Sequence, residues 1–174
     1  KKIVTTSLFR TPKIWDAETG ENIADLTGHK DWVTSAIFSA DGKKIVTASR
    51  DNTAKIWDAA SGKKIADLTG HRDAVTSAVF SADSKKIVTA SFDNTAKIWD
   101  VETGKEIADL TGHGDRVISA EFSADGKKVV TASWDSTAKV WDVETRKIIA
   151  DLTGHEGPVL SAVFYADGKK VVTA

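Results

Sequence analysis

The chain repeats one unit of 42 residues from end to end, and this periodicity constrains its fold more than any other feature. Gly-His recurs at residues 28–29, 70–71, 112–113 and 154–155, and Trp-Asp recurs at 15–16, 57–58, 99–100 and 141–142. Segments 43–84 and 85–126 differ at 10 aligned positions, so 32 of 42 residues match. A long unit that keeps one register indicates a repeat architecture, in which each copy packs against its neighbours.

Each unit has the pattern of four short strands. In residues 28–69, runs rich in β-branched and aromatic residues at 32–39, 43–49, 53–58 and 64–69 are separated by Gly, Asp, Asn and Ser. This spacing predicts an antiparallel meander, because the intervening residues favour turns. No apolar stripe with a helical period persists through the turns. One such sheet cannot bury both faces alone, so the copies must stack as a propeller or a solenoid.

Composition excludes several classes of protein. The chain has 24 Lys and Arg against 25 Asp and Glu, which is not the charge balance of a typical nucleic-acid-binding domain. It has no Cys, so disulfides, thiolate catalysis and Cys-based metal sites are absent. No phosphate-binding loop or H-E-x-x-H motif occurs, and no apolar run is long enough for a membrane span. We therefore expect no cofactor, no metal and no membrane association.

The Gly-His and Trp-Asp pairs, with their 42-residue period, resemble those of the WD-repeat β-propeller family over the whole chain. The resemblance implies an all-β propeller of four-stranded antiparallel blades, with about four repeats in this chain. We letter the strands of each unit a to d, starting from its Gly-His pair. The resemblance then divides the single array into a partial blade at 1–27 (strands b-c-d), three whole blades at 28–69, 70–111 and 112–153, and a partial blade at 154–174 (strands a-b).

The family resemblance also implies a structural role for the histidines. In the family, this His, a strand-b Ser or Thr, the turn Asp and the Trp form one hydrogen-bonded chain. The matching sets are His29, Ser49, Asp51 and Trp57; His71, Ser91, Asp93 and Trp99; and His113, Ser133, Asp135 and Trp141. A catalytic triad is the alternative interpretation, but an enzyme needs one asymmetric site rather than three identical ones. We expect no catalytic residue.

Positions that vary among these uniform copies are candidates for partner binding. They carry Trp, Phe and Arg, which are enriched at interface hot spots, and in the family they border the top face of the propeller. The candidates are Lys30, Trp32, Arg50, Arg72, Phe92, Arg116 and Trp134. Drift at tolerant turn positions is the alternative explanation.

These features predict a non-enzymatic, cytoplasmic scaffold or sensor module that binds a protein or peptide on its top face. Near-uniform arrays of this kind resemble those of bacterial multidomain proteins, in which a propeller accompanies an ATPase or protease domain. Nucleic-acid binding is an alternative, through base stacking and charge at Arg50, Arg72, Arg116, Trp32, Phe92 and Trp134. An engineered repeat protein without an evolved partner is a further alternative.

Three positions depart from the repeat pattern. Glu121 replaces Ile37, Val79 and Val163 of the other copies on strand a, either as a channel-lining charge or as a tolerated imperfection. In the first unit, Phe9 replaces the turn Asp and Pro12 falls in strand c, where it would remove a ladder hydrogen bond. We therefore expect the first blade to lack the complete hydrogen-bonded set.

The two ends of the chain predict self-association. Residues 1–6 and 169–174 are both strand b, and about four repeats are too few for a family ring. Two copies supply eight repeats, so strand a of one copy could complete the b-c-d blade of the other in a homodimer. The competing explanation is that the chain is cut from a longer array.

Overall fold

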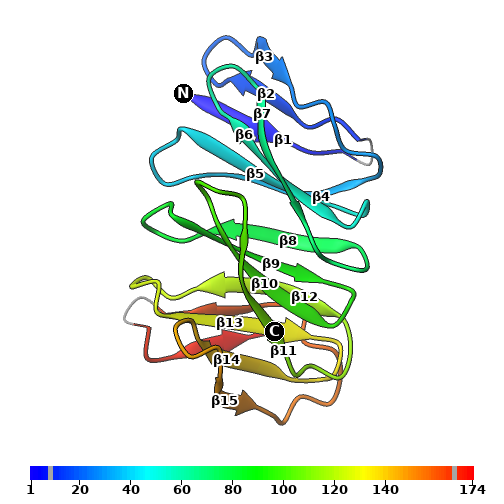
Figure 1. Cartoon of the computed structure of the whole chain (residues 1–174), viewed down its shortest axis with the longest axis vertical. Helices are drawn as coiled ribbons and strands as arrows, with labels where there is room; N and C mark the ends of the chain where they lie inside the picture. Colours follow the sequence, from blue (N-terminus) through cyan, green and yellow to red (C-terminus); the bar gives the residue numbers. More distant parts are fainter. Residues whose placement is uncertain (8–9, 166–167) are drawn as a thin grey trace.

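The computed structural model describes residues 1–7, 10–165 and 168–174, and these residues form strands and turns with no helix. The predicted all-β fold of four-stranded antiparallel sheets is confirmed. The sheets stack in chain order, with the first and last at opposite ends (Figure 1), so the ring of blades is open.

Three sheets have all four strands, each a meander in which neighbours in sequence are neighbours in space. The first contains β4 (Val33–Phe38), β5 (Lys44–Ser49), β6 (Thr53–Asp58) and β7 (Lys64–Thr69). The second contains β8 (Val75–Phe80), β9 (Lys86–Ser91), β10 (Thr95–Asp100) and β11 (Glu106–Thr111). The third contains β12 (Val117–Phe122), β13 (Lys128–Ser133), β14 (Ala138–Asp142) and β15 (Ile148–Leu152).

The end sheets are smaller. At the N-terminal end, β1 (Lys2–Thr5), β2 (Lys13–Asp16) and β3 (Asn22–Asp25) form a three-stranded sheet without a strand a. Strand β2 begins directly after Pro12, whose carbonyl accepts a hydrogen bond from the Leu26 amide, at 2.8 Å. At the C-terminal end, β16 (Ala162–Phe164) and β17 (Val171–Thr173) form a hairpin. The expectation for Phe9 lies outside the described residues.

The core lies between the sheets. One cluster joins Val46, Ile56 and Leu68 of one sheet to Phe80 and Trp99 of the next. Strands b and c are covered on both faces, so their buried positions run continuously instead of alternating. Neighbouring copies therefore bury each other's faces, and stacking supplies most of the hydrophobic stabilisation.

The signature dipeptides have packing reasons. A Cβ added to Gly28 would lie 3.3 Å from the Trp57 ring, so glycine gives the indole its space. The Asp that follows this Trp shapes the c–d turn, since the Asp58 carboxylate accepts hydrogen bonds from the Ser61 amide (2.7 Å) and hydroxyl (2.6 Å). The b–c turn places Asn52 at φ 67°, a left-handed conformation that Asn tolerates well.

Candidate interaction surface

Four residues of each complete blade lie in one buried hydrogen-bonded network. His29 Nδ1 lies 2.8 Å from Asp51 Oδ2, and His29 Nε2 lies 2.7 Å from the Thr47 hydroxyl. The Trp57 indole N–H donates to the same hydroxyl at 2.9 Å. The other complete sheets repeat the network with His71, Asp93, Thr89 and Trp99 and with His113, Asp135, Thr131 and Trp141.

The donors and acceptors fix the histidine tautomer. An indole N–H can only donate, so the hydroxyl of Thr47 accepts from Trp57 and gives its own hydrogen to His29 Nε2. The imidazole must then carry its proton on Nδ1, from which it donates to Asp51. The network therefore runs Trp to Thr to His to Asp, and each member is satisfied.

The structure corrects the predicted hydroxyl. Thr47, Thr89 and Thr131 occupy the place assigned to Ser49, Ser91 and Ser133. The Ser49 hydroxyl instead donates to the Asp31 carbonyl (3.1 Å) and accepts from the Asp51 amide (3.1 Å). Register decides the choice: Thr47 pairs with Lys55, which puts it diagonally beside Trp57, whereas Ser49 lies two residues farther along the strand.

The electrostatics of the network favour a neutral imidazole beside an ionised carboxylate. Burial alone would raise the pKa of Asp51, but hydrogen bonds from His29, Thr53 and the Lys30 amide outweigh it and hold that pKa well below its usual range. Burial lowers the pKa of His113 despite the nearby Asp135. The threonine hydroxyl at the centre is completely buried, so no substrate can reach it. This network joins the strands of one blade through satisfied hydrogen bonds.

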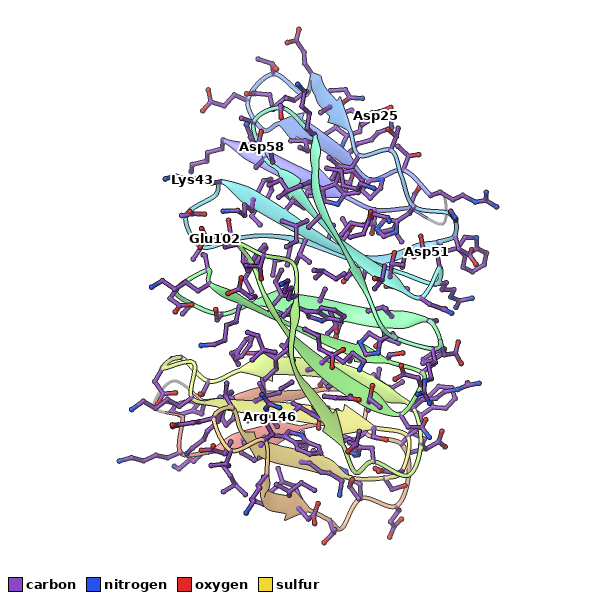
Figure 2. All side chains as sticks on the ribbon, in the orientation of Figure 1. Asp25, Lys43, Asp51, Asp58, Glu102 and Arg146 are labelled. Atoms are coloured by element: carbon purple, nitrogen blue, oxygen red, sulfur yellow. The ribbon has the colours of Figure 1, made fainter. Side chains whose placement is uncertain are left out.

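The turns divide between two edges of the stack. Lys43 of the a–b turn and Asp58 and Glu102 of the c–d turns lie along one edge, and Asp51 of a b–c turn lies along the opposite one (Figure 2). We call the edge that carries the b–c turns and the Gly-His loops the top face, since each Gly-His histidine is hydrogen-bonded to its b–c turn Asp.

Five of the seven variable positions form stacked contacts on the top face. The Arg50 guanidinium lies 4.6 Å from the centre of the Trp32 ring. The Arg116 guanidinium lies 4.6 Å from the Phe92 ring centre and 4.9 Å from that of Trp134. These two rings lie 6.0 Å apart and come from neighbouring sheets, so the arginine and the two rings form one three-membered cluster. The sequence could not show this pairing, because the partners are 18 to 24 residues apart on separate turns.

Lys30 and Arg72 take no part in this stacking. Both side chains are exposed, and their backbone amides donate to Asp51 and Asp93, at 2.8 and 2.9 Å respectively. They stand at the same loop position in successive copies, where the third complete sheet has Gly114.

Glu121 lies on β12, directly opposite Val130 on β13. Burial alone raises the pKa of its carboxyl, and no hydrogen bond or ion pair to it is formed by the described residues. β12 packs against β16. The carboxylate therefore lies partly buried at an interface between sheets, without a partner that would offset its desolvation.

The described part of the chain has no group of His, Asp and Glu residues arranged to hold a metal ion. Among the same residues there is no helix that could cross a membrane.

Comparison with known proteins supports the repeat assignment. A family model described as "WD domain, G-beta repeat" matches residues 20–58, 62–100 and 104–142. The Nuclear distribution protein PAC1-2 of Postia placenta is 39% identical over 41 residues, which are 24% of this chain. The match spans 10% of that curated protein, about the length of one repeat.

Proposed function

The chain belongs to the WD-repeat family, and on that premise we propose that it is a non-enzymatic scaffold that binds a protein or peptide on its top face. Repeats of this family generally mediate protein interactions. The finer assignment to the top face rests on the stacked residues there, and a cytoplasmic location rests on the resemblance alone.

The observation that carries the proposal is the exposure of large aromatic rings at turns that need no bulk. Trp32 is 42% exposed and Trp134 is 38% exposed, although both are already ordered by arginine stacking. Preordered aromatic and arginine side chains lose little entropy on binding, which is why they dominate interface energetics. Other copies hold Ala74 and Pro158 at the position of Trp32, and Arg50 at that of Trp134, so the fold requires neither ring.

Protein binding is favoured over nucleic-acid binding by what covers the rings. Base stacking needs open aromatic faces. Here the Arg50 guanidinium covers one face of Trp32, and the Arg116 guanidinium contacts both Phe92 and Trp134. Asp31, Asp73 and Asp115 stand in the same loops and would repel a phosphate backbone.

A peptide-display selection tests the proposal. A random peptide library is panned on the chain and on a variant with Trp32, Arg50, Phe92, Arg116 and Trp134 replaced by Ala. The matched control replaces the exposed Lys43, Lys85 and Lys127 by Ala on the opposite edge. We expect enriched peptides that bind the chain and the control but not the top-face variant, at an unchanged melting temperature. Peptides that bind all three proteins equally, or no enrichment at all, would contradict the proposal.

We further propose that two copies of the chain associate through their end faces. Ile3 is 49% exposed and Val172 is 58% exposed, whereas their counterparts Ile45 and Val46 are fully buried between sheets. Inside the chain, the sheet face that corresponds to that of Val172 packs against the next sheet. We therefore expect the end faces of two copies to pack in the same way.

Each end also holds one half of the buried network. The Trp15 indole donates to the Thr5 hydroxyl at 2.7 Å, and His155 Nε2 lies 2.7 Å from the Thr173 hydroxyl. Thr5 and Thr173 occupy the position of Thr47, which in a complete sheet joins the His to the Trp. In the register of β4 and β5, β16 of one copy could pair with β1 of the other only in the place that its own β17 holds. Such an exchange of strands is a separate contact from the stacking of end faces, and in it His155 and Trp15 would share Thr5.

A further inference from the structure

Arg116 is a half-buried cation of the top face, and it contacts two aromatic rings at once. Its guanidinium lies 4.6 Å from the Phe92 ring centre and 4.9 Å from the Trp134 ring centre. Its backbone amide donates to the Asp115 carboxylate at 2.7 Å, and its carbonyl accepts from the Trp134 amide at 2.9 Å. Both the backbone and the side-chain plane of this arginine are therefore fixed before any partner arrives.

The in-plane donors of this guanidinium are unused. A stacked guanidinium presents its N–H groups around its rim, and Arg116 forms neither an ion pair nor a side-chain hydrogen bond with any of the residues that the structure describes. Among the described residues, the guanidinium itself contacts the two aromatic rings and no carboxylate. A fork of ordered, unpaired N–H donors is complementary to a carboxylate, which it can bind through two parallel hydrogen bonds.

We propose that Arg116, packed against Phe92 and Trp134, is the subsite that receives a side-chain carboxylate of an acidic peptide. This inference rests on the proposed top-face function and names the chemistry of the partner. The two aromatic rings beside the guanidinium accommodate the aliphatic part of a Glu or Asp side chain. Gly114 assists, because the loop has no long side chain where Lys30 and Arg72 stand in other copies.

The surrounding charge argues for recognition by geometry instead of by bulk attraction. Lys30, Arg50, Arg72 and Arg116 bring four positive charges to the top face. Six carboxylates of the same loops and turns outnumber them: Asp31, Asp51, Asp73, Asp93, Asp115 and Asp135. Such a balance gives no long-range attraction for a polyanion. Affinity must then come from the ordered fork, and only one copy in this chain has it, since Trp32, Ala74 and Pro158 occupy the position in the others.

Fluorescence anisotropy with a labelled peptide of alternating Glu and Ser tests the subsite, alongside the same peptide with Gln for Glu. We expect the Glu peptide to bind the chain and the Gln peptide to bind about tenfold more weakly, since a charge-assisted pair is lost. Arg116→Lys keeps the charge but not the planar fork, and should also lose about tenfold. The matched control, Arg72→Lys, removes an unstacked guanidinium of the same face and should bind as the unaltered chain does.

The outcomes separate this inference from the proposed function. Equal losses in Arg116→Lys and Arg72→Lys, or equal binding of the Glu and Gln peptides, would overturn the subsite. Tighter binding of a single-stranded oligonucleotide that also depends on Arg116 would overturn it in favour of nucleic acid. Display-selected peptides that bind the top face but lack acidic residues would overturn the subsite and leave the proposed function standing. Circular dichroism and chemical denaturation establish that both arginine variants are folded.

Discussion

At the residue scale, the hydroxyl of Thr89 is the centre of the buried network, because it joins the His71 ring to the Trp99 indole. Thr89→Val keeps the shape of the side chain and leaves His71 Nε2 and the Trp99 indole N–H without a hydrogen bond. We expect a loss of about 2–4 kcal/mol in the free energy of unfolding, from two buried groups at about 1–2 kcal/mol each. Urea denaturation measures it, and Thr89→Ser, which keeps the hydroxyl, serves as the control.

The corresponding serine provides the contrasting variant. The hydroxyl of the buried Ser91 donates to the Asp73 carbonyl (3.0 Å) and accepts from the Asp93 amide (3.1 Å). Asp73 is exposed and Asp93 is half-buried, so water can replace the hydroxyl as their partner. Ser91→Ala should therefore cost about 1 kcal/mol or less. A larger loss in Ser91→Ala than in Thr89→Val would contradict the assignment of the network to threonine.

The same network makes stability depend on pH. Asp51, Asp93 and Asp135 have folded pKa values below the usual range because hydrogen bonds outweigh burial, so their stabilisation is complete above about pH 4 and lost as pH falls further. The pKa of His113 is lowered by burial, so the unfolded chain binds that proton first and stability begins to fall below about pH 6.5. Unfolding free energies measured between neutral and acidic pH should decline through both ranges. His113→Gln should remove the upper decline and leave the lower one.

At the element scale, β12 carries the one strand-a position at which a carboxylate replaces an aliphatic residue. Burial raises the pKa of Glu121, so the ionised form is penalised in the folded state and the penalty grows as pH rises past the ordinary carboxyl value. Glu121→Val restores the residue of Val79 and should raise the unfolding free energy by about 1 kcal/mol at neutral pH. Denaturation should show the gain shrinking toward pH 4. A gain that does not change with pH would mean that the carboxylate pays no desolvation penalty.

The elements themselves could be read from local sequence, and the contacts between them could not. Turn residues and β-branched runs predicted a strand at 43–49, and β5 spans Lys44–Ser49. Thr47 and Ser49 lie on the same face of this strand, so only its register with β6 shows which hydroxyl reaches Trp57. The contact of Arg116 with both Phe92 and Trp134 depends on how two sheets stack, and no pattern within one repeat encodes it.

At the scale of the whole molecule, the open stack has complementary ends, and association of two copies would cover both. The face that presents Val172 and the face that presents Ile3 correspond to surfaces that are buried against each other inside the chain. Their apolar area favours association, and a head-to-tail contact related by a twofold axis closes without leaving a free end. An exchange of strands, with β1 of one copy in the place of β17 of the other, would instead join His155 to the Thr5 and Trp15 pair.

Light scattering should accordingly give twice the monomer mass of 18.7 kDa at high protein concentration. Val172→Asp places a charge in the proposed contact and should give a folded monomer, because this side chain is 58% exposed within one chain. Ile65→Asp is the matched control: Ile65 is 47% exposed on the outer strand β7, away from either end face, and its variant should remain a dimer. His155→Ala should weaken the dimer and leave the unfolding of the monomer nearly unchanged, since this histidine is exposed in the single chain. A stable, soluble monomer of the unaltered chain would rule out the association.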